Sequence, residues 1–474
     1  MSEKVYDVII IGAGLSGLAA GIRLAYFGKK VCLLEQHSKV GGLNSFYQFK
    51  GMTLDAGLHA LTNFVSKGNT STPLAKLSRQ LRIKLEEFEL SEQNKSCIHF
   101  PEKVLEFTNN LEYLKDNLTK VFPYEANGFL KLLNYIEGYD ATNLNNPAGS
   151  AKKVVRSFLT DPLLIDMLFC PLMYYGSAQE NDMDISQFAI MFRSIFWEGF
   201  ARPIDGIIRI LNLLVEKFLN CGGELHLKTE VKKVITKGKH IEKIILNNGE
   251  ELEAKYVISS AGLYETLNLC FDEDQVSSTI APILLGQLSF VEAILFLNKR
   301  PEELGYSTTI TFYNDSDRFK YERPQTFVDL HSGVICCPDN FQYKKENEPQ
   351  TSVIRITNIA NFDLWSSLDK EGYLKKKKEC FRDVLTIIER HIPGISEAVV
   401  DKDIFTPITI KRFTGHINGA VYGTPKKTRD GTTRYDNLFI CGTDQGFLGV
   451  VGTMLSGITM ANLHCLNKIS GFQD

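Results

Sequence analysis

The sequence predicts an α/β protein in which one domain, assembled from three separate stretches of chain, carries an inserted α+β domain. Three observations favour this class. A buried strand, a glycine-rich turn and a helix begin the chain, a helix followed by several strands lies mid-chain, and a second glycine-rich turn and helix end it. With 474 residues the chain also exceeds what one hydrophobic core usually supports. We predict one domain from residues 1–62, 203–265 and 416–474, and the inserted domain from 63–202 and 266–415.

The first element is a strand at Val8–Ile11, an apolar, β-branched run typical of a parallel strand that is buried on both faces. Three glycines follow, and each has its own physical task. Gly12 permits a tight turn, Gly14 lets a pyrophosphate approach the backbone, and Gly17 lets the next helix pack closely on the strand. The N-terminus of that helix, with Leu15 and Ser16, is expected to face the anion.

The helix runs to Tyr26, Gly28 ends it, and a second strand at Val31–Leu34 closes a βαβ unit on Glu35. An acid at this place typically holds a ribose hydroxyl, and Gln36 lies beside it. The context therefore predicts a Rossmann-like dinucleotide cradle. A tight strand-to-helix turn without a ligand is the alternative, and the glycine motif alone does not choose between NAD and FAD.

A second glycine pair, Gly41-Gly42, follows Glu35 closely. This segment resembles the one that FAD-binding oxidoreductases of the amine oxidase and phytoene desaturase superfamily place over the pyrophosphate. The resemblance implies FAD as the cofactor. Those relatives usually continue with arginine, whereas this chain has Leu43, so one phosphate contact must be supplied otherwise.

Asp55-Ala56-Gly57-Leu58-His59 resembles the D-x-G-x-H segment of carotenoid isomerase-like and retinol saturase-like flavoproteins. The resemblance implies that His59 lies near the isoalloxazine ring, which makes it the first candidate for a general acid or base. A capping or turn histidine is the alternative, because one histidine carries little information.

The second part of the cofactor domain begins at Pro203-Ile204-Asp205-Gly206, which resembles the P-x-G-G that precedes the same helix in this superfamily. We predict a helix at 207–219, strands at 225–234, 240–246 and 251–254, and a buried strand at 256–262 that returns toward the cofactor with Ala261 and Gly262. By resemblance, Val231 meets the adenine through its backbone.

The C-terminal stretch resembles the flavin motif of the bacterial phytoene desaturase, carotenoid isomerase and retinol saturase family. Gly442 and Asp444 match its first step, and Phe447-Leu448 replaces the usual Pro-Gly. The second step is matched by Gly449, Val450, Gly452, Ser456 and Gly457. The resemblance implies that Asp444 bonds the ribityl or phosphate part of FAD and that the amides around Val450, Val451 and Gly452 lie against the flavin. A glycine-rich turn that only packs two helices is the alternative.

Two very apolar helical segments, 158–176 and 188–200, mark the inserted domain. For most of their residues we favour ordinary core, and for the pair together we favour the wall of a pocket for a long hydrocarbon. Contact with a membrane surface stays open. We predict short helices at 74–81 and 111–118, a longer one at 122–139, strands at 286–297 and 351–359, and an amphipathic helix at 374–392 with Leu374 on its apolar side.

Composition narrows the function classes. The net charge is −3 and the sequence shows no basic stripe, which argues against a nucleic-acid partner. The ten cysteines are scattered and show no zinc-type spacing, so we predict a reduced, cytosolic chain without a metal site. The N-terminus lacks the features of a signal peptide, and the apolar tract 280–297 is broken by polar residues, which favours strands over a membrane helix.

Three functions follow from these observations. The first is an FAD-dependent oxidoreductase that desaturates or isomerises a long apolar substrate, such as a carotenoid polyene, by hydride exchange with flavin N5. The second keeps the redox chemistry but uses an acyl chain, which an acyl carrier protein could present, or an amine. The third is a flavin- or lipid-binding protein without activity. Bond position, electron acceptor and oligomeric state leave no signal in the sequence.

Overall fold

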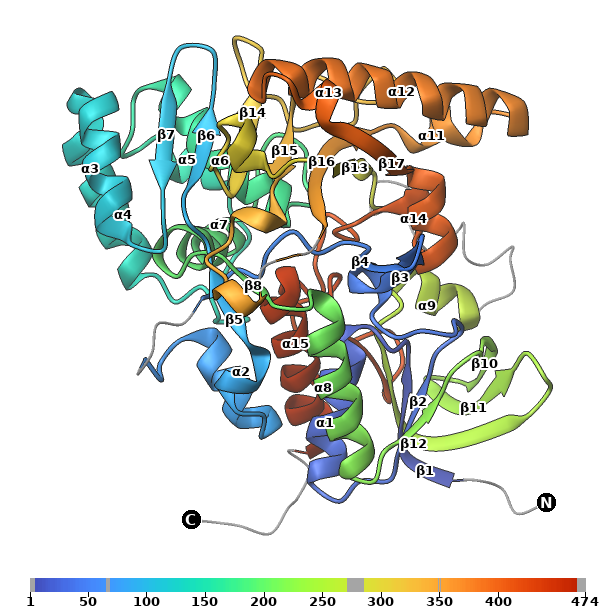
Figure 1. Ribbon diagram of the computed structural model, residues 1–474. Helices are drawn as coiled ribbons and strands as arrows, with labels where there is room; N and C mark the ends of the chain where they lie inside the picture. Colours follow the sequence, from blue (N-terminus) through green and yellow to red (C-terminus); the bar gives the residue numbers. More distant parts are fainter. Residues whose placement is uncertain (1–4, 65–68, 271–284, 348, 350, 467–474) are drawn as a thin grey trace.

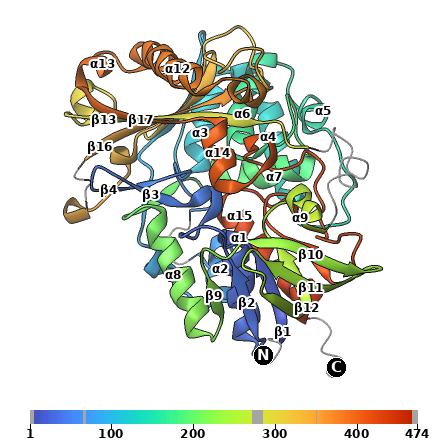
Figure 2. The same ribbon diagram turned by 90° about the vertical axis from the view of Figure 1, so that its right-hand side faces the viewer.

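The computed structural model describes residues 5–64, 69–270, 285–347, 349 and 351–466. Two seven-stranded sheets organise these residues, one in the lower half of the molecule and one in the upper half (Figures 1 and 2).

The lower sheet is mostly parallel. Its strand order is β10-β11-β12-β1-β2-β9, and β18 pairs with β12. The pairs β9–β2, β2–β1, β1–β12 and β12–β18 are parallel, whereas β10, β11 and β12 form an antiparallel meander. The strands span Val5–Ile11 (β1), Val31–Leu34 (β2), Glu224–His226 (β9), Val231–Lys237 (β10), His240–Leu246 (β11), Glu251–Ser259 (β12) and Leu438–Ile440 (β18).

Alternating side chains of β1 bury both faces of this sheet. Val8 and Ile10 join the core beneath helices α1 (Leu15–Tyr26), α2 (Pro73–Leu81), α8 (Ile207–Asn220) and α15 (Gly449–Met460). Ile9 and Ile11 face the opposite core, formed with β10, β11 and α9 (Leu263–Cys270). Burial on both sides explains why β1 is a continuous apolar run.

The upper sheet has the order β17-β13-β16-β15-β14-β6-β7. Its strands span Ser96–His99 (β6), Val104–Phe107 (β7), Ser289–Leu297 (β13), Ile310–Asn314 (β14), Ser332–Cys336 (β15), Ser352–Ala360 (β16) and Val399–Phe405 (β17). One face packs on the aromatic core of α3 (Leu111–Val121), α4 (Ala126–Gly138), α5 (Ala151–Val155), α6 (Pro162–Gly176) and α7 (Ile185–Phe192). The other face packs on α12 (Lys370–His391), which crosses the top of the molecule (Figure 1).

Shorter elements join the two layers. Two small sheets pair β3 (Phe46–Phe49) with β4 (Met52–Asp55) and β5 (Leu90–Glu92) with β8 (Ala201–Pro203). The remaining helices are α11 (Phe362–Ser366), α13 (Ile395–Ala398), α14 (Pro407–Thr414), the π-helical turns Arg193–Trp197 (η4) and Ala461–Leu466 (η10), and the 3₁₀ turns Gly42–Asn44 (η1), Leu85–Phe88 (η2), Pro123–Glu125 (η3), Pro301–Leu304 (η6), Pro338–Asn340 (η7), Lys345–Asn347 (η8) and Ile417–Gly419 (η9).

The predicted α/β class and the order of elements in the cofactor domain are confirmed, with corrections to individual elements. The expected strand 225–234 is two strands, β9 and β10, and the two strands expected at 251–254 and 256–262 are one, β12. The segment 63–202, read as helical, also contributes β5, β6 and β7, because short edge strands leave little periodicity. Leu374, expected on the apolar side of α12, is 51% exposed. The domain boundaries stay predictions, and residues 280–284 lie outside the described part.

One helical segment among the described residues, Gly449–Leu466, is long and apolar enough to cross a membrane by length and composition. Half of it is buried against the protein, and it packs on α1 over the lower sheet (Figure 1). It therefore serves as a core helix in this fold.

Candidate functional site

The three N-terminal glycines occupy positions that differ in free space. A Cβ on Gly12 would lie 2.6 Å from the Ser260 Oγ, and one on Gly17 would lie 2.1 Å from the Gly12 carbonyl oxygen. A Cβ on Gly14 would meet only the Ser260 Oγ, at 4.0 Å. Gly12 and Gly17 are therefore required for packing, whereas Gly14 borders open space where a ligand can approach the backbone.

The second glycine pair faces this open space. Gly41 forms a β-bridge with Gly14 and donates its N–H to the Ala13 carbonyl at 2.9 Å. A Cβ on Gly42 would lie 3.6 Å from the Gly14 Cα. The structure thus brings the two glycine motifs together as two sides of one cradle. Leu43 is half-buried within η1.

Two helices enter the site with N-termini that no side chain caps. Gly14 is the N-cap of α1 and Leu448 that of α15, and neither first turn holds an acidic residue. Uncapped amides and the helix dipole favour a bound anion or a polar edge at each end. Val450, Val451 and Gly452 lie in the first turn of α15, where such amides are available.

The N-terminal and C-terminal motifs touch at Ser16. A Cβ on Gly442 would lie 2.9 Å from the Ser16 Oγ, and one on Gly457 would lie 2.0 Å from the Ser16 carbonyl oxygen. Ser456 accepts the Gly442 N–H at 2.8 Å and fixes the turn after β18. Glycine at 457 therefore lets α15 cross α1 closely.

Glu35 lies at the carboxyl end of β2 and is 7% exposed. Its carboxylate accepts the Ala13 N–H at 2.8 Å and the His37 N–H at 2.9 Å, so it is held beside the cradle. Gln36 is exposed, and Val231 begins β10 and is buried. Their contacts with the cofactor stay predictions.

Asp444 is a buried brace between distant segments. Its carboxylate oxygens accept the Leu263 N–H and the Thr424 N–H, each at 2.6 Å. Leu263 follows Ala261 and Gly262, so the end of the β12 segment is tied to the C-terminal motif. A contact of Asp444 with the ribityl or phosphate part of FAD stays a prediction, whereas its bracing role is seen directly.

His59 does not stand alone as a turn residue. Its Nε2 lies 2.9 Å from the Glu292 Oε1 and 3.1 Å from the Thr357 Oγ1, and its side chain is 12% exposed. Arg355 donates from Nε to the same Glu292 oxygen at 2.7 Å. The structure therefore places His59 against a buried charge pair at the face of the upper sheet.

The charges in this group determine its protonation. Burial opposes ionisation of Glu292, but His59 and Arg355 outweigh it and lower the pKa of Glu292 to about 2. A carboxylate is thus maintained inside an otherwise apolar strand. Sequence reasoning missed both charges, although an acid within the apolar strand β13 and an arginine between the isoleucines of β16 are the signal that could have identified them.

Two arginines hold the loop that carries His59. Arg355 donates to the Asp55 and Ala56 carbonyls, each at 2.8 Å, and Arg202 donates to the His59 carbonyl at 2.7 Å and pairs with the Asp55 carboxylate. The Asp55 Oδ1 also accepts the Ile207 N–H at 2.8 Å, which caps α8. The loop between the two sheets is therefore fixed from both sides.

Glu198 is a second acid that sequence reasoning missed. Asn63 donates from Nδ2 to its carboxylate at 2.6 Å, and burial is the main reason that its pKa is raised to about 7. Thr62, the neighbour of Asn63, lies 3.8 Å from where a Cβ on Gly449 would stand. Glu198 is thus linked, through two residues, to the beginning of α15.

An aromatic core covers this part of the upper sheet. Met173, Phe192 and Phe196 are buried, as expected for ordinary core, whereas Tyr175 and Trp197 are half-buried. The Tyr175 hydroxyl and the Trp197 Nε1 are buried atoms without a hydrogen-bond partner among the described residues. The Tyr175 ring also lies 6.4 Å from the ring of His59, so this aromatic core adjoins the charged group.

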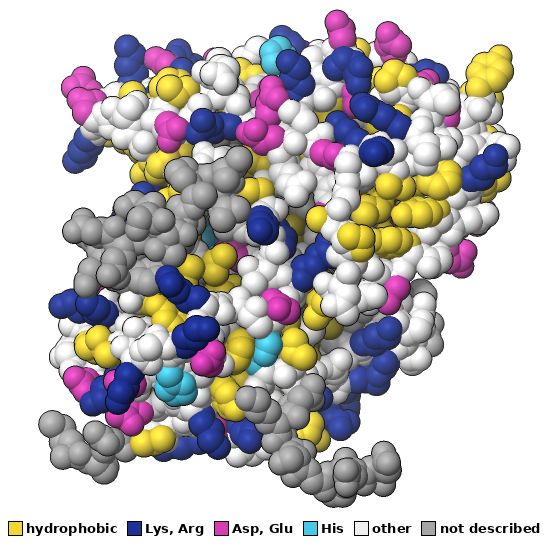
Figure 3. Space-filling view, turned by 180° about the vertical axis from the view of Figure 1, so that it is seen from behind, with side chains coloured by type: hydrophobic (Ala, Val, Ile, Leu, Met, Phe, Trp, Pro, Cys, Tyr) yellow, Lys and Arg dark blue, Asp and Glu magenta, His cyan; other side chains and the backbone are white. Residues whose placement is uncertain are grey.

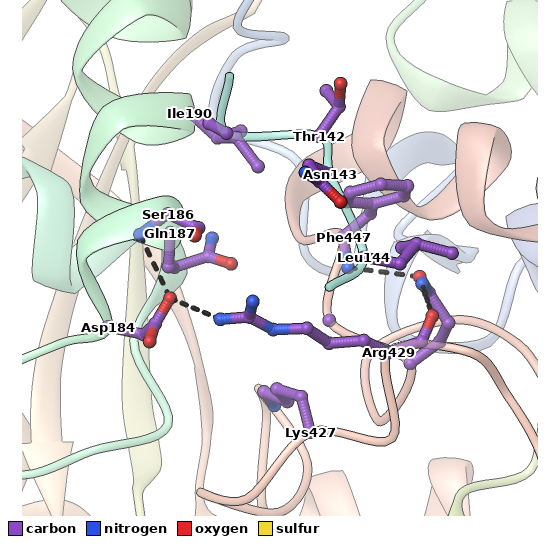
Figure 4. A pocket seen from close by; sticks show the side chains of 13 residues that line it. Thr142, Asn143, Leu144, Asp184, Ser186, Gln187, Ile190, Lys427, Arg429 and Phe447 are labelled. Atoms are coloured by element: carbon purple, nitrogen blue, oxygen red, sulfur yellow. Dashed lines mark hydrogen bonds and ion pairs between the residues drawn. The ribbon is translucent and has the colours of Figure 1, made fainter. Parts of the chain in front are cut away.

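A small cavity of about 40 Å³ lies where the C-terminal loop meets α7 (Figure 4). Asp184 and Arg429 pair across it at 2.6 Å, and Phe447, one of the departures from the family motif, lines it. Burial lowers the pKa of Lys427, another lining residue, to about 8 although Asp444 opposes the shift. The volume of this cavity suits a few water molecules and not a long substrate.

Residues 15–463 match the model of a family described as flavin containing amine oxidoreductase. The chain belongs to this family. It is 23% identical to a chloroplastic prolycopene isomerase of Daucus carota over 97% of this chain and 80% of that protein, and 22% identical to an all-trans-retinol 13,14-reductase of Danio rerio over 96% and 85%. A crystal structure of an oxidoreductase from Methanosarcina mazei shares the fold, with a TM-score of 0.66 and 17% identity, and the alignment covers 95% of this chain and 99% of that one.

The protein is therefore an FAD-dependent oxidoreductase related to carotenoid-modifying flavoproteins. The residues present fit the cofactor. Gly14 leaves open the space that a side chain would fill, the uncapped N-terminus of α1 begins beside it, and the carboxylate of Glu35, the residue expected to hold a ribose, is fixed next to it by the Ala13 N–H.

Proposed function

We propose that this oxidoreductase acts on a long apolar polyene, by double-bond isomerisation or by desaturation. The observation that carries the proposal is the position of the aromatic core of α6 and α7. This core adjoins the loop that carries His59, and Thr62 of the same loop lies beside the first residue of α15. Apolar and aromatic side chains with few polar groups suit a hydrocarbon ligand. The relationship to a prolycopene isomerase supports the same substrate class.

Bound FAD would supply hydride exchange at N5. The cradle of Gly14, Gly41 and Gly42 and the amides of α15 would hold it. The aromatic core would position the polyene and exclude water, which matters because a polyene has no acidic group for an enzyme to use.

His59 is proposed as the residue that organises the boundary between the aromatic core and the flavin site. Glu292 and Thr357 fix its imidazole, and Arg202 fixes its carbonyl. We expect His59→Ala to reduce turnover by at least about tenfold while flavin content is unchanged. Unchanged turnover in the flavin-loaded variant would remove His59 from the mechanism.

The purified, flavin-loaded protein tests the function directly. A poly-cis carotenoid in detergent is incubated anaerobically with oxidised and with reduced enzyme, and products are separated by chromatography. Isomers without a change in mass indicate isomerisation, and a loss of two hydrogens with flavin bleaching indicates desaturation.

The other hypotheses predict different results in the same experiment. Bleaching only by an acyl chain, free or on an acyl carrier protein, or only by an amine overturns the polyene proposal and keeps the redox chemistry. Flavin that reacts with none of these substrates favours a binding protein.

We also propose a cytoplasmic enzyme that contacts the membrane peripherally to collect its substrate. Tyr124, in η3, is 100% exposed, and Leu130, in α4, is 46% exposed. Figure 3 shows the molecule from behind, after a 180° turn from the view of Figure 1. Hydrophobic side chains gather on its right-hand side, which is the side where α3 and α4 lie in this view. Exposed apolar groups on one side of an enzyme suit a lipid surface.

A further inference from the structure

Three titratable side chains that are far apart in the sequence meet in the upper half of the molecule, separately from the cofactor cradle. His99 is the last residue of β6, Asp315 directly follows β14, and His391 is the last residue of α12. Strands β6 and β14 are parallel and pair His99 with Tyr313. The carboxyl ends of two neighbouring strands thus meet the C-terminus of a long helix.

One ligand atom from each of these three residues lies within 4.8 Å of the other two. The His391 Nε2 lies 3.3 Å from the Asp315 Oδ1, and the ring centroids of His99 and His391 are 5.1 Å apart. Ligands at the corners of a tetrahedral Zn²⁺ site are separated by about 3.3 Å, since each lies about 2.0 Å from the metal. The His391–Asp315 edge already has this length.

These side chains have hydrogen-bonding capacity that the described protein does not use. Among the described residues, the His99 Nδ1 and the Asp315 Oδ2 are buried atoms without a hydrogen-bond partner, and the His391 Nε2 has its 3.3 Å ion pair with the Asp315 Oδ1. The His391 side chain is 5% exposed. Unsatisfied buried atoms facing one another call for an additional partner, and a cation satisfies two imidazoles and a carboxylate together.

The surroundings also favour a cation. His391 ends α12, where the helix dipole concentrates negative partial charge. The competing positive charge is Arg390, whose Nη1 lies 4.0 Å from the Asp315 Oδ2 and whose side chain is 63% exposed. An exposed arginine can turn to solvent, so it does not block the site.

We propose that His99, Asp315 and His391 bind Zn²⁺, with water as the fourth ligand, and that the bound ion fastens the end of α12 to the upper sheet. No sequence motif predicts this site, because its three ligands come from segments that are far apart in the chain. The sequence prediction of no metal rested on spacing alone.

Zinc titration of the full-length, flavin-loaded protein after chelator treatment tests the proposal. We expect one equivalent of Zn²⁺ per chain by calorimetry and elemental analysis, and a higher melting temperature with zinc present. His391→Gln and His99→Gln should each weaken binding by at least about 100-fold, two factors of ten in affinity. The exposed His331→Gln is the matched control and should bind as the wild type does.

Flavin content and circular dichroism show that each variant is folded before it is titrated. X-ray absorption at the zinc edge should then show nitrogen and oxygen neighbours at about 2.0 Å, with two imidazoles. Absence of a stoichiometric site, or equal affinity in wild type and both glutamine variants, would overturn the proposal. Selective binding of Fe²⁺ in place of Zn²⁺ would overturn the metal assignment.

Discussion

At the residue scale, Glu292 is held as a carboxylate by its contacts with His59 and Arg355, in a place where burial alone would favour the neutral acid. Removing one partner from such a group leaves the others buried and uncompensated. Glu292→Gln should therefore lower the free energy of unfolding by about 3–5 kcal/mol at pH 7, measured by urea denaturation.

The same contact has a defined pH dependence. Because the pKa of Glu292 is lowered on folding, to about 2, its stabilisation is present above about pH 4.5 and disappears as the pH falls to about 2. The difference between wild type and variant should shrink over that window. The exposed Glu242→Gln is the control, and a constant difference across the window would contradict the assignment.

Glu198 should show the opposite dependence. Its pKa is raised, mainly by burial, to about 7, so the folded state retains a proton that the unfolded state releases above about pH 4.5. Stability then decreases as the pH rises from about 4.5 to 7. Glu198→Gln should remove this slope and gain about 3 kcal/mol over the wild type between pH 4.5 and 8. Parallel pH profiles of melting temperature for the two proteins would refute it.

At the element scale, different glycines of the N-terminal strand–turn–helix unit serve ligand binding and folding. Gly14 has an extended backbone, with φ −68° and ψ 174°, and borders open space, so Gly14→Val should fold and lose FAD. Gly17→Val should fail to fold, because its Cβ would lie 2.1 Å from the Gly12 carbonyl oxygen. Flavin absorbance per chain and circular dichroism of both variants test this, and a flavin-loaded Gly14→Val protein would contradict it.

At the scale of the whole molecule, the loop that carries His59 ties the two halves together, because Arg355 binds the carbonyls of Asp55 and Ala56 and Arg202 binds those of Leu58 and His59. This arrangement fixes the upper, apolar half over the cofactor half. The side that we propose to face lipid lies near α3 and α4.

That side can be tested with lipid vesicles. The double variant Tyr124→Ser and Leu130→Ser should sediment with phosphatidylcholine vesicles several-fold less than the wild type, since it loses exposed apolar area. Val400→Ser, which alters an exposed apolar residue on β17, is the control. Equal sedimentation of all three proteins would place the membrane contact elsewhere or exclude it.

Contacts between residues close in the sequence could be predicted, whereas contacts that form only when the chain folds could not. The cradle of Gly12, Gly14 and Gly17 was readable because strand, turn and helix follow one another within one βαβ unit. The partners of His59 were not, since Glu292 and Arg355 come from strands more than two hundred residues away. The short strands β5, β6 and β7 were missed for a related reason, because an edge strand is stabilised by its neighbours.

The sequence by itself determined the fold class, the cofactor and the family, because glycines that meet a backbone or a phosphate tolerate few substitutions and leave a local signature. Only the tertiary structure decided which charges are buried together, how Ser16 joins the N-terminal and C-terminal motifs, how Asp444 ties the C-terminal motif to the end of the β12 segment, and that two histidines and an aspartate converge at the end of α12. The reason is physical. Burial and electrostatic coupling depend on distances between segments, and those distances exist only after the chain has folded.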